Sequence, residues 1–385
     1  MNTELTKFHS REITIVGGSL AGLTLALACA RKGIAVHVIE RSAGHFAGGD
    51  SLSVDLSAVA ETVGYDPRKH PALPVVPAYR ELTTWPALYN WLRDRVKETP
   101  DILLEEGKTI VSVSDIDGGA CITFADGTEK MTDAVIGADG YRSIVRQAIT
   151  PEAPFAKYAG YLVWRGLVEE QTLEHPVVWP TNGGLWIDFV EGYRLVAATL
   201  PGRDGSLEIG QRQITFAWFD THQDELLRRK GCLTTEGHIV GTLTRGSIDE
   251  LLREELATLA TRIWSSVWVE AVVTGIRSAS ILSGAPIAEF SPLRLAHGAM
   301  AIVGDAAHVI SPMTGRGYLT GVDDARVLSH ELAKLKSDEP IATALVRYEK
   351  IRLPYVRALV NHSCTISAEY RRYAESGGVG FSEEI

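Results

Sequence analysis

The chain has little of what marks metal-binding, secreted or nucleic-acid-binding proteins. Only 4 of its 385 residues are cysteines, and none stands at the Cys/His spacing of a zinc site. Because Cys29, Cys121, Cys232 and Cys364 are scattered, they favour a reducing compartment, and we expect a cytoplasmic protein. The formal net charge is -10 and there is no basic block, which argues against a nucleic-acid partner.

Long hydrophobic runs are also absent, except at residues 13–30. This uncharged segment of 18 residues meets the length criterion for a membrane helix. However, Gly17, Gly18 and Gly22 interrupt it at the spacing of a turn, and the residues before them are β-branched. We therefore expect a buried strand, a turn and a helix, and no membrane partner. Residues 1–12 are polar and charged and do not resemble a signal peptide.

The turn carries the frame Gly17-x-Ser19-x-x-Gly22, with Ser19 where dinucleotide-binding turns usually have glycine. Gly17 permits the tight turn, a small middle residue lets a pyrophosphate approach, and Gly22 lets the helix pack on the strand. Glu40 lies 18 residues after Gly22, where a carboxylate accepts hydrogen bonds from a ribose hydroxyl. We expect dinucleotide binding at the helix N-terminus, with a purely structural tight turn as the alternative.

Most of the rest of the chain is expected to form α/β segments, whereas residues 158–218 form an aromatic-rich block. A β–α–β unit is expected at residues 13–16, 20–31 and 35–39. Further helices are expected at residues 87–97, 249–264, 318–335 and 341–371, and short strands at residues 109–113, 120–124, 134–136 and 300–303. Strands at residues 161–166, 185–189, 193–200 and 213–219 are typical of an antiparallel sheet.

Two further segments carry motifs. Residues 133–146 read DAVIGADGYRSIVR, and residues 299–324 read AMAIVGDAAHVISPMTGRGYLTGVDD. Together with the N-terminal frame, they resemble the three ordered motifs of the class A FAD-dependent aromatic monooxygenases, the para-hydroxybenzoate hydroxylase superfamily. Residues 158–166, YAGYLVWRG, are similar to the branch that contains the 2,6-dihydroxypyridine 3-hydroxylases and the FAD-dependent urate hydroxylases.

The resemblance implies an α/β fold in which a Rossmann-like FAD-binding domain is interleaved with an antiparallel β-sheet substrate domain and followed by a long C-terminal helix. The FAD-binding domain is expected to comprise residues 1–75, 101–155 and 281–335. Residues 76–100 are expected to form a substrate-domain or helical insertion, residues 156–280 the β-rich substrate domain, and residues 336–385 a C-terminal helical segment.

The resemblance also implies which residues bind FAD. Asp305 matches the aspartate that binds the ribityl hydroxyls, and Pro312 matches the proline beside the isoalloxazine ring. Arg142 and Arg146 are candidates for phosphate or nicotinamide contacts, with a surface ion pair as the alternative. Trp85 stands where many members have an FAD-contacting arginine. The cofactor-binding candidates are Gly17, Ser19, Leu20, Ala21, Gly22, Glu40, Arg41, Asp139, Gly140, Gly304, Asp305, Pro312, Gly315, Gly317 and Tyr318.

The family chemistry would be that of a single-component enzyme. With one dinucleotide-binding unit, NAD(P)H has no domain of its own and is expected to bind transiently. The resemblance implies hydroxylation of an electron-rich aromatic or N-heterocyclic small molecule with NAD(P)H and O2, through a flavin C4a-hydroperoxide and without a metal. The alternatives are epoxidation, Baeyer–Villiger oxidation or reduction on the same scaffold, or a flavin-binding sensor without turnover.

The catalytic candidates are His308, Tyr161 and Arg165. His308 can accept a phenolic proton, with a histidine bonded to backbone as the alternative. Arg165 can pair with an anionic substrate or with a nearby acid. The substrate-lining candidates are Trp164, Trp186, Tyr193 and Trp218, for each of which ordinary sheet core is the alternative. The same aromatic block offers an interface for a homodimer.

Overall fold

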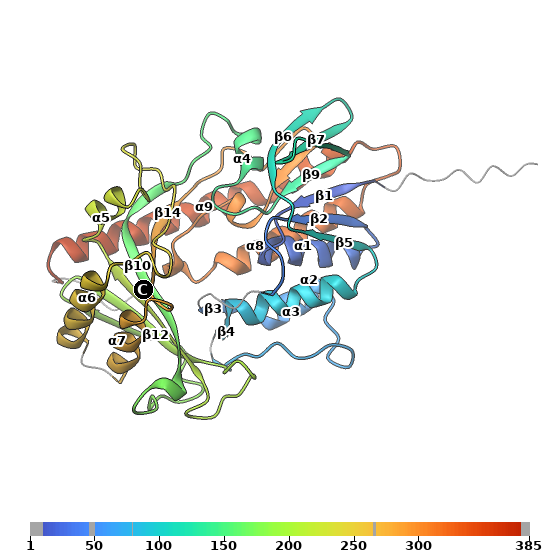
Figure 1. Ribbon diagram of the computed structural model, residues 1–385. Coiled ribbons are helices and arrows are strands. Elements are labelled where there is room, and N and C mark those ends of the chain that lie inside the picture. The colour runs from blue at the N-terminus through green and yellow to red at the C-terminus, as the bar shows by residue number, and fades with distance from the viewer. Residues whose placement is uncertain (1–10, 46–50, 79, 265–266, 379–385) are drawn as a thin grey trace, which may run out of the picture.

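The chain forms two domains joined by a long helix, as seen in a computed structural model that describes residues 11–45, 51–78, 80–264 and 267–378 (Figure 1). The ends of the first and last predicted segments, residues 1–10 and 379–385, lie outside the described residues. Four cysteines are present as free thiols. Among the described residues, no helix is long and apolar enough to cross a membrane, and no cluster of three His, Cys, Asp or Glu side chains suits a metal ion.

The first domain, here the six-stranded domain, is built on a sheet of order β15-β16-β9-β1-β2-β5. Its strands are β1 (Ile13–Val16), β2 (Val36–Glu40), β5 (Ile102–Glu106), β9 (Ala134–Gly137), β15 (Ala296–His297) and β16 (Met300–Ile302). All pairs are parallel except β15 with β16. The predicted β–α–β unit is confirmed, because α1 (Leu20–Ala30) connects β1 to its parallel neighbour β2.

Helices α2 (Leu56–Val63), α3 (Trp85–Glu98) and α8 (Gly317–Ala333) pack against α1. Because neighbours surround it, α1 buries nearly its whole circumference and has no polar face. Within the predicted insertion at residues 76–100, α3 contributes Leu88 and Leu92 to the same core as α1, while the proposed domain boundaries stay a prediction. Strands β6 (Ile110–Ile116), β7 (Gly119–Phe124) and β8 (Glu129–Thr132) form a small antiparallel sheet, followed in the chain by β9 and α4 (Ile144–Ile149).

The second domain, here the β-rich domain, contains the predicted antiparallel sheet. Its strand order is β11-β12-β13-β10-β14. The bounds are β10 (Lys157–Glu169), β11 (Trp186–Val190), β12 (Tyr193–Leu200), β13 (Gln213–Asp220) and β14 (Ser283–Glu289). Helices α6 (Glu250–Ile263) and α7 (Val269–Arg277) cover one face, and α5 (Asp224–Arg229) follows β13. We call this side the helix-covered face and the opposite side the inner face.

The inner face is turned toward the six-stranded domain. Strands β3 (Ser51–Val54) and β4 (Glu81–Thr84) form an antiparallel pair at its lower end, where Leu82 packs on Ala198 and Leu200. The 3-10 turn η3 (Pro312–Thr314), which precedes α8, adjoins its other end through Met313. The sheet therefore stands opposite the segment that carries the third motif.

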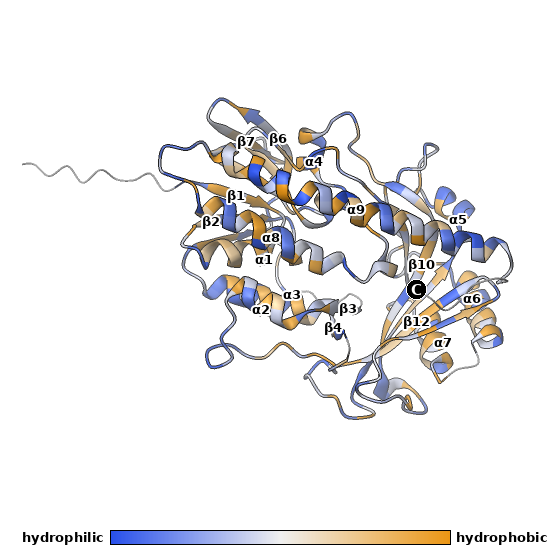
Figure 2. Cartoon of the chain, turned by 180° about the vertical axis from the view of Figure 1, so that it is seen from behind, coloured by the Kyte–Doolittle hydropathy of each residue, from blue (hydrophilic) through white to orange (hydrophobic). Residues whose placement is uncertain are grey.

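Helix α9 (Ile341–Glu375) runs along both domains, as Figure 2 shows from behind. Its first part buries Leu345 and Tyr348 in the core of the six-stranded domain, and its last part buries Tyr370 and Tyr373 against the β-rich domain. Pro354 lies inside the helix, where it cannot donate a backbone hydrogen bond. The predicted long C-terminal helix is thus confirmed, and it fastens one domain to the other.

Candidate active site

The three sequence motifs meet at one edge of the six-stranded sheet. Gly17 has a φ of +102°, and a Cβ added to it would lie 2.5 Å from the carbonyl oxygen of Ala138. A Cβ added to Gly22 would lie 1.9 Å from the carbonyl oxygen of Gly17. Side chains larger than hydrogen would separate α1 from the turns after β1 and β9, so these two glycines allow the close approach that the sequence predicted.

The third motif contacts α1 on its other side. Gly304 has a φ of +59°, and a Cβ there would lie 2.7 Å from the Cβ of Ala21. The hydroxyls of Thr24 and Tyr318 lie 3.1 Å apart, which ties α1 to the first turn of α8. Segments that are almost 300 residues apart in the chain therefore form one continuous surface around the N-terminus of α1.

Two helix N-termini at this surface have no capping side chain. Ser19, the N-cap of α1, makes no side-chain cap, and the first turn of α1 contains no acidic residue. The same holds for α8, whose N-cap is Arg316. Because the first N–H groups of a helix carry a partial positive charge and need acceptors, both ends suit negatively charged groups of a ligand.

Glu40 is held rigidly at the carboxyl end of β2. Its Oε2 accepts a hydrogen bond of 2.7 Å from the amide of Gly18, and its Oε1 accepts one of 2.8 Å from the amide of Ser42. The carboxylate is thereby fixed beside the Gly17 turn with further lone pairs free to accept. Arg41, the next residue, is exposed.

Two carboxylates of the motifs have acceptor atoms that a ligand can use. Asp305 is exposed, although Gly304 and Ala306 on either side of it are buried. Desolvation by the surrounding protein raises its pKa, while the charges of His308 and Arg146 oppose that rise. Asp139 accepts a 2.8 Å hydrogen bond from the amide of Ile144 through Oδ2, but its buried Oδ1 has no partner within the described part of the chain.

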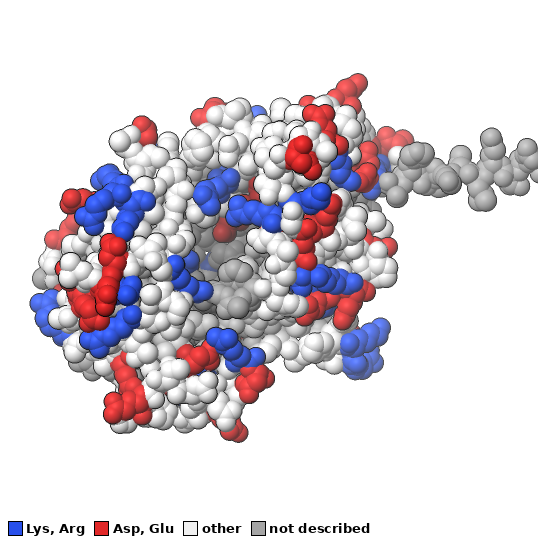
Figure 3. All heavy atoms as spheres, viewed as in Figure 1, with Lys and Arg blue, Asp and Glu red and all other residues white. Residues whose placement is uncertain are grey.

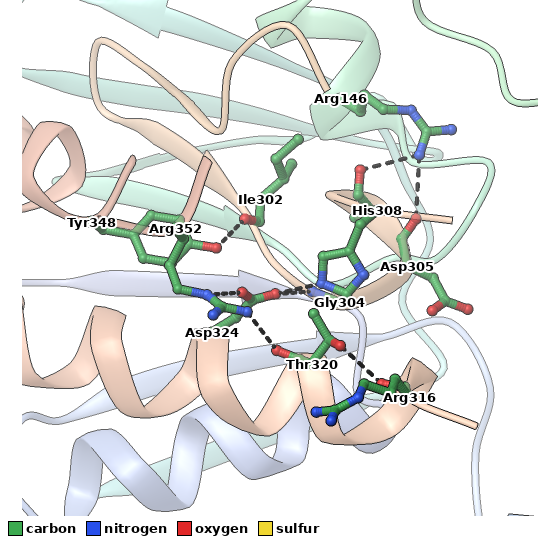
Figure 4. A network of polar contacts seen from close by, with 11 residues as sticks. Arg146, Ile302, Gly304, Asp305, His308, Arg316, Thr320, Asp324, Tyr348 and Arg352 are labelled. Carbon is green, nitrogen blue, oxygen red and sulfur yellow. Dashed lines mark hydrogen bonds and ion pairs between the residues drawn. The ribbon is translucent and has the colours of Figure 1, made fainter. Parts of the chain in front are cut away.

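Beneath the Asp305 turn lies a buried polar network centred on Asp324 (Figure 4). Its carboxylate accepts hydrogen bonds from the amide of Gly304 at 3.0 Å, from Nε2 of His308 at 2.8 Å and from Nε of Arg352 at 2.7 Å. Burial acts to raise the pKa of Asp324, but His308 and Arg352 outweigh it and hold that pKa low. A charged Asp324 therefore fastens the turn that precedes Asp305 to α8 and α9.

The position of His308 corrects one expectation. Its side chain has no exposed surface, and its Nε2 is engaged by Asp324 (Figure 4). A base that takes a proton from a substrate must come within hydrogen-bond reach of it. The surroundings of His308 instead favour a positioning role, in which the ring supports the turn at residues 304–306.

Arg146 is also buried, and it fastens the second motif to the third. Its guanidinium donates to the carbonyl oxygens of Pro154 at 2.9 Å, of Ala306 at 3.0 Å and of Tyr141. Because these contacts hold the guanidinium inside the protein, Arg146 has a structural role and does not make the expected contact with a phosphate or nicotinamide group. Arg142, by contrast, is exposed and donates to the carbonyl oxygen of Val240 at 3.1 Å.

Tyr161 links the inner face of the β-rich sheet to η3. Its hydroxyl donates to Oγ of Ser311 at 2.7 Å and lies 3.1 Å from Oγ of Ser367 on α9. Burial raises the pKa of Tyr161 to about 12. Ser311 directly precedes Pro312, so this hydroxyl positions the turn that was expected to lie beside the flavin ring.

The four aromatic residues expected to line the substrate site lie on the helix-covered face. Trp164 and Trp218 are fully buried, and the ring of Trp218 packs edge-on against Trp264 at the end of α6. Tyr193 packs on Trp218, and Trp186 packs on Trp179. The expectation is corrected because strand side chains alternate, which turns these residues away from the six-stranded domain.

Their neighbours in sequence occupy the inner face. Val163 pairs with Phe219, and Arg165 pairs with Ala217 across β10 and β13. Arg165 and Ala217 are only half-buried, although both lie on an inner side of the molecule. Figure 3 shows a hollow between the two domains, with several Lys and Arg side chains at its rim. Alternation along residues 161–166 separates Val163 and Arg165 from Trp164 in the sequence, but the structure is needed to show which of the two sets faces inward.

Trp85 begins α3, at the place where an arginine was expected from the resemblance. It stacks on Tyr89 with ring centroids 4.9 Å apart and planes 12° apart. The other cofactor candidates, Leu20, Gly140, Gly315 and Gly317, lie in or beside the turns already described.

Comparisons with known proteins agree with this geometry. Profiles described as FAD binding domain, FAD binding domain-like and NAD(P)-binding Rossmann-like domain match residues 245–363, 158–278 and 15–72. The 2,6-dihydroxypyridine 3-monooxygenase of Paenarthrobacter nicotinovorans is 25% identical over 84% of this chain and 83% of its own length. The FAD-dependent urate hydroxylase of Klebsiella oxytoca is 28% identical over 81% of this chain and 67% of its own length. The chain is an FAD-dependent monooxygenase, similar over most of its length to class A enzymes.

Solved structures show the same fold. The 2,6-dihydroxypyridine-3-hydroxylase from Arthrobacter nicotinovorans superposes with a TM-score of 0.77 at 22% identity, covering 98% of this chain and 95% of that one. HpxO from Klebsiella pneumoniae, complexed with FAD and uric acid, superposes with a TM-score of 0.70 at 20% identity, covering 97% of this chain and 95% of that one.

The residues present in this monooxygenase fit FAD. The uncapped N-terminus of α1 suits the pyrophosphate, Glu40 a ribose hydroxyl, and Asp305 the ribityl hydroxyls. The unpartnered Oδ1 of Asp139 and the uncapped N-terminus of α8 provide one more acceptor and one more set of donors. When bound, FAD supplies electron transfer and oxygen activation, and the protein supplies binding, orientation and electrostatics.

Proposed function

We propose that this monooxygenase is a single-component enzyme that hydroxylates an electron-rich aromatic or N-heterocyclic small molecule, with NAD(P)H as electron donor and O2 as co-substrate. The observation that carries the proposal is the placement of the Asp305–Tyr318 motif opposite the half-buried inner face of the β-rich sheet. The two relatives named above act, by their names, on a dihydroxypyridine and on urate.

The inner face would hold the substrate against the cofactor. Arg165, Val196 and Ala217 are half-buried there, and the cationic Arg165 among aliphatic neighbours can orient a flat polar ring. Tyr161 and the Asp324 network would position η3 and the Asp305 turn around the flavin. Excluding water from this space strengthens the polar contacts that orient the substrate.

NAD(P)H would be a transient visitor rather than a resident cofactor. The six-stranded domain has one uncapped glycine-turn helix after a parallel strand, α1, and the candidate FAD residues already surround it. The preceding strand and Glu40 complete a single dinucleotide-binding unit within the described ranges.

The test is turnover by the purified, FAD-loaded protein. A panel of phenols and hydroxypyridines is added with NADH or NADPH, and product is scored by incorporation of labelled oxygen from O2. Hydroxylated product that carries the label supports the proposal. A protein that binds FAD but forms no labelled product with the panel contradicts it, and steady NAD(P)H oxidation with peroxide alone would identify an oxidase.

The homodimer and the cytoplasmic location stay proposals. Of the aromatic residues that suggested an interface, Trp164 and Trp218 are fully buried inside the protomer, whereas Trp186 is only partly buried. A homodimer interface could therefore not use Trp164 or Trp218, and the mass of the purified protein in solution tests whether a homodimer forms.

A further inference from the structure

One of the buried arginines, Arg194, has no hydrogen-bond acceptor among the described residues. Six arginines among the described residues are buried: Arg93, Arg95, Arg146, Arg194, Arg212 and Arg352. Five of them donate to carboxylates or carbonyl oxygens, for example Arg212 to Glu170 at 2.6 Å and Arg352 to Asp324 at 2.7 Å. Arg194 is the exception, because no acceptor within the described ranges receives a hydrogen bond from its guanidinium.

Aromatic rings surround Arg194 on β12. Its guanidinium carbon lies 4.6 Å from the ring centroid of Phe219 and 5.6 Å from that of Phe189. Such contacts attract a cation, but they accept no hydrogen bond in the plane of the guanidinium. The ionisable groups whose charges act on its pKa are the phenols of Tyr161 and Tyr370, and no carboxylate is among them.

A second unsatisfied donor lies in the same cluster. The hydroxyl of Tyr161 is taken up by Ser311 and Ser367, whereas the buried hydroxyl of Tyr370 has no partner in the part of the chain that the structure describes. The rings of Tyr161 and Tyr370 meet edge to face with centroids 5.2 Å apart. Arg194 and Tyr370 therefore bring together two donors that lack an acceptor.

This pair lies on the inner face, beside the expected position of the flavin. Met313, which follows Pro312, packs against the same cluster. Val196, Ala217 and Ile287 at its border are only partly buried, so the cluster opens toward the space between the domains. Arg93, Arg146, Arg212 and Arg352, in contrast, lie in cores or motif turns where carboxylates or carbonyl oxygens accept from them. Arg95 donates through Nη2 to the carbonyl oxygen of Val63, although its Nε and Nη1 have no partner among the described residues.

An unpaired buried charge is costly, whereas one that is paired and hydrogen-bonded can be tolerated. Burial lowers the pKa of Arg194 to about 10, which keeps the guanidinium protonated at neutral pH. The group that satisfies a planar cation and a phenol together is an oxyanion, since the guanidinium fork matches a carboxylate and a phenol can donate to either oxygen.

We propose that Arg194 and Tyr370 form the oxyanion-binding subsite of the substrate pocket, which holds a carboxylate or a deprotonated ring hydroxyl of the aromatic substrate. The inference rests on the proposed function and deepens it by naming the charge of the substrate. A deprotonated hydroxyl held in this way donates electron density to the ring and makes its carbon atoms more nucleophilic. A carboxylate would instead serve to orient the ring.

The first test needs no substrate. Arg194→Met keeps the apolar stem and removes an unpaired charge, so its Tm should equal or exceed that of the wild type. Arg212→Met is the matched control, because it removes an arginine whose partner Glu170 is buried, and it should lower the Tm by about 5 °C or more. A fall in Tm for Arg194→Met as large as that for Arg212→Met would overturn the proposal and make Arg194 structural.

The second test measures binding by changes in flavin absorbance. One probe pair is 3-hydroxybenzoate against 3-hydroxybenzyl alcohol, and the other is 2,6-dihydroxypyridine against 2,6-dimethoxypyridine. We expect wild-type enzyme to prefer 3-hydroxybenzoate in the first pair or 2,6-dihydroxypyridine in the second, and Arg194→Met to bind the preferred compound more weakly, on the order of 30-fold or more. Tyr370→Phe should weaken that binding less, while leaving binding of the neutral member unchanged.

The pair that shows the preference tells a carboxylate from a ring hydroxyl. Equal affinities for both members of both pairs in the wild type, or affinities unchanged in Arg194→Met, would overturn the proposal. Binding is measured without turnover, so the two proposals can fail separately. A protein that binds the anion through Arg194 but yields no hydroxylated product refutes the proposed function and leaves the subsite standing.

Discussion

The two faces of the β-rich sheet are built from alternate residues of the same strands, yet they differ in almost every physical property. On the helix-covered face, Trp164 and Trp218 are fully buried, and the indole nitrogen of Trp164 donates to Asp220 at 3.0 Å. On the inner face, Arg165 and Ala217 are half-buried, and Arg194 is buried without an acceptor among the described residues. One face holds the domain together, and the other is the face that we propose binds the substrate.

The difference teaches that size and aromatic character are poor guides to a binding face. Large aromatic side chains contribute most when they are removed from water, so they collect where helices can cover them. A substrate face needs room and unsatisfied polar groups, which smaller residues and isolated charges provide. Each of the following experiments changes one side of this comparison.

The largest effect is expected from Trp218→Ala on the helix-covered face. It would leave a cavity between the sheet and α6 and should lower the free energy of unfolding by about 3–5 kcal/mol, as measured by urea denaturation. Ala217→Ser at the next position faces inward and should change stability by less than about 1 kcal/mol while changing substrate affinity. The comparison breaks down if Trp218→Ala leaves stability intact and weakens substrate binding instead.

Asp324→Asn should destabilise the protein by about 3–5 kcal/mol, because it removes the negative partner of the buried Arg352. Asp323→Asn is the matched control at the adjacent position, since Asp323 pairs with Arg326 at the surface and should cost less than about 1 kcal/mol. Thermal unfolding of both variants measures the difference. Equal Tm values would show that the network beneath the Asp305 turn contributes no more to stability than a surface ion pair does.

Asp305→Ala should weaken FAD about 10- to 100-fold, since a charged acceptor of hydrogen bonds is worth about 1.5–3 kcal/mol. Its side chain is exposed, so the stability of the FAD-free protein should change little. Fluorescence titration with FAD gives the affinity, and Asp305→Asn provides an uncharged acceptor for comparison. Flavin affinity that is unaltered in Asp305→Ala would contradict the assignment.

The smallest effect concerns His222 at the end of β13. A hydrogen bond to Asp220 is the main cause of its raised pKa, and Nδ1 lies 3.1 Å from Oδ1 of that carboxylate. The stabilisation is complete below the unfolded pKa of about 6.5 and is lost as pH rises through the higher folded value. It should stay below about 1 kcal/mol, because the histidine side chain is 55% exposed. Urea denaturation at several pH values should show that the free energy of unfolding of His222→Gln lacks this pH dependence.

The sequence predicted those parts of the fold whose signals are local. Residues 13–40 contain a β-branched strand, spaced glycines and an acidic strand end, and all of these appear in β1, α1 and β2. It did not predict β14, whose sequence SGAPIAE contains glycine and proline and has only tertiary contacts to make it a strand. The pair β3–β4 was missed for the same reason, since its partners lie 27 or more residues apart.

The site was predicted where a motif is one compact turn and missed where it depends on packing. Gly17, Gly22 and Gly304 lie in close contacts that require glycine. Alternation divides a strand such as β10 into two sets of side chains, but it does not say which set the helices cover. For that reason the tryptophans were assigned to the wrong face, and Arg194 was overlooked because its surroundings come from four elements.

Helix α9 has a consequence for how the chain can be divided. It bonds to the six-stranded domain through Tyr348 and the carbonyl oxygen of Ile302, and to the β-rich domain through Ser363 and Ser367, which both donate to Glu289. It also supplies Arg352 to one buried network and Tyr370 to the inner face. A fragment that ends before residue 341 would lack groups from both domains at once, so complementation by a separately added α9 peptide should restore the two together rather than one after the other.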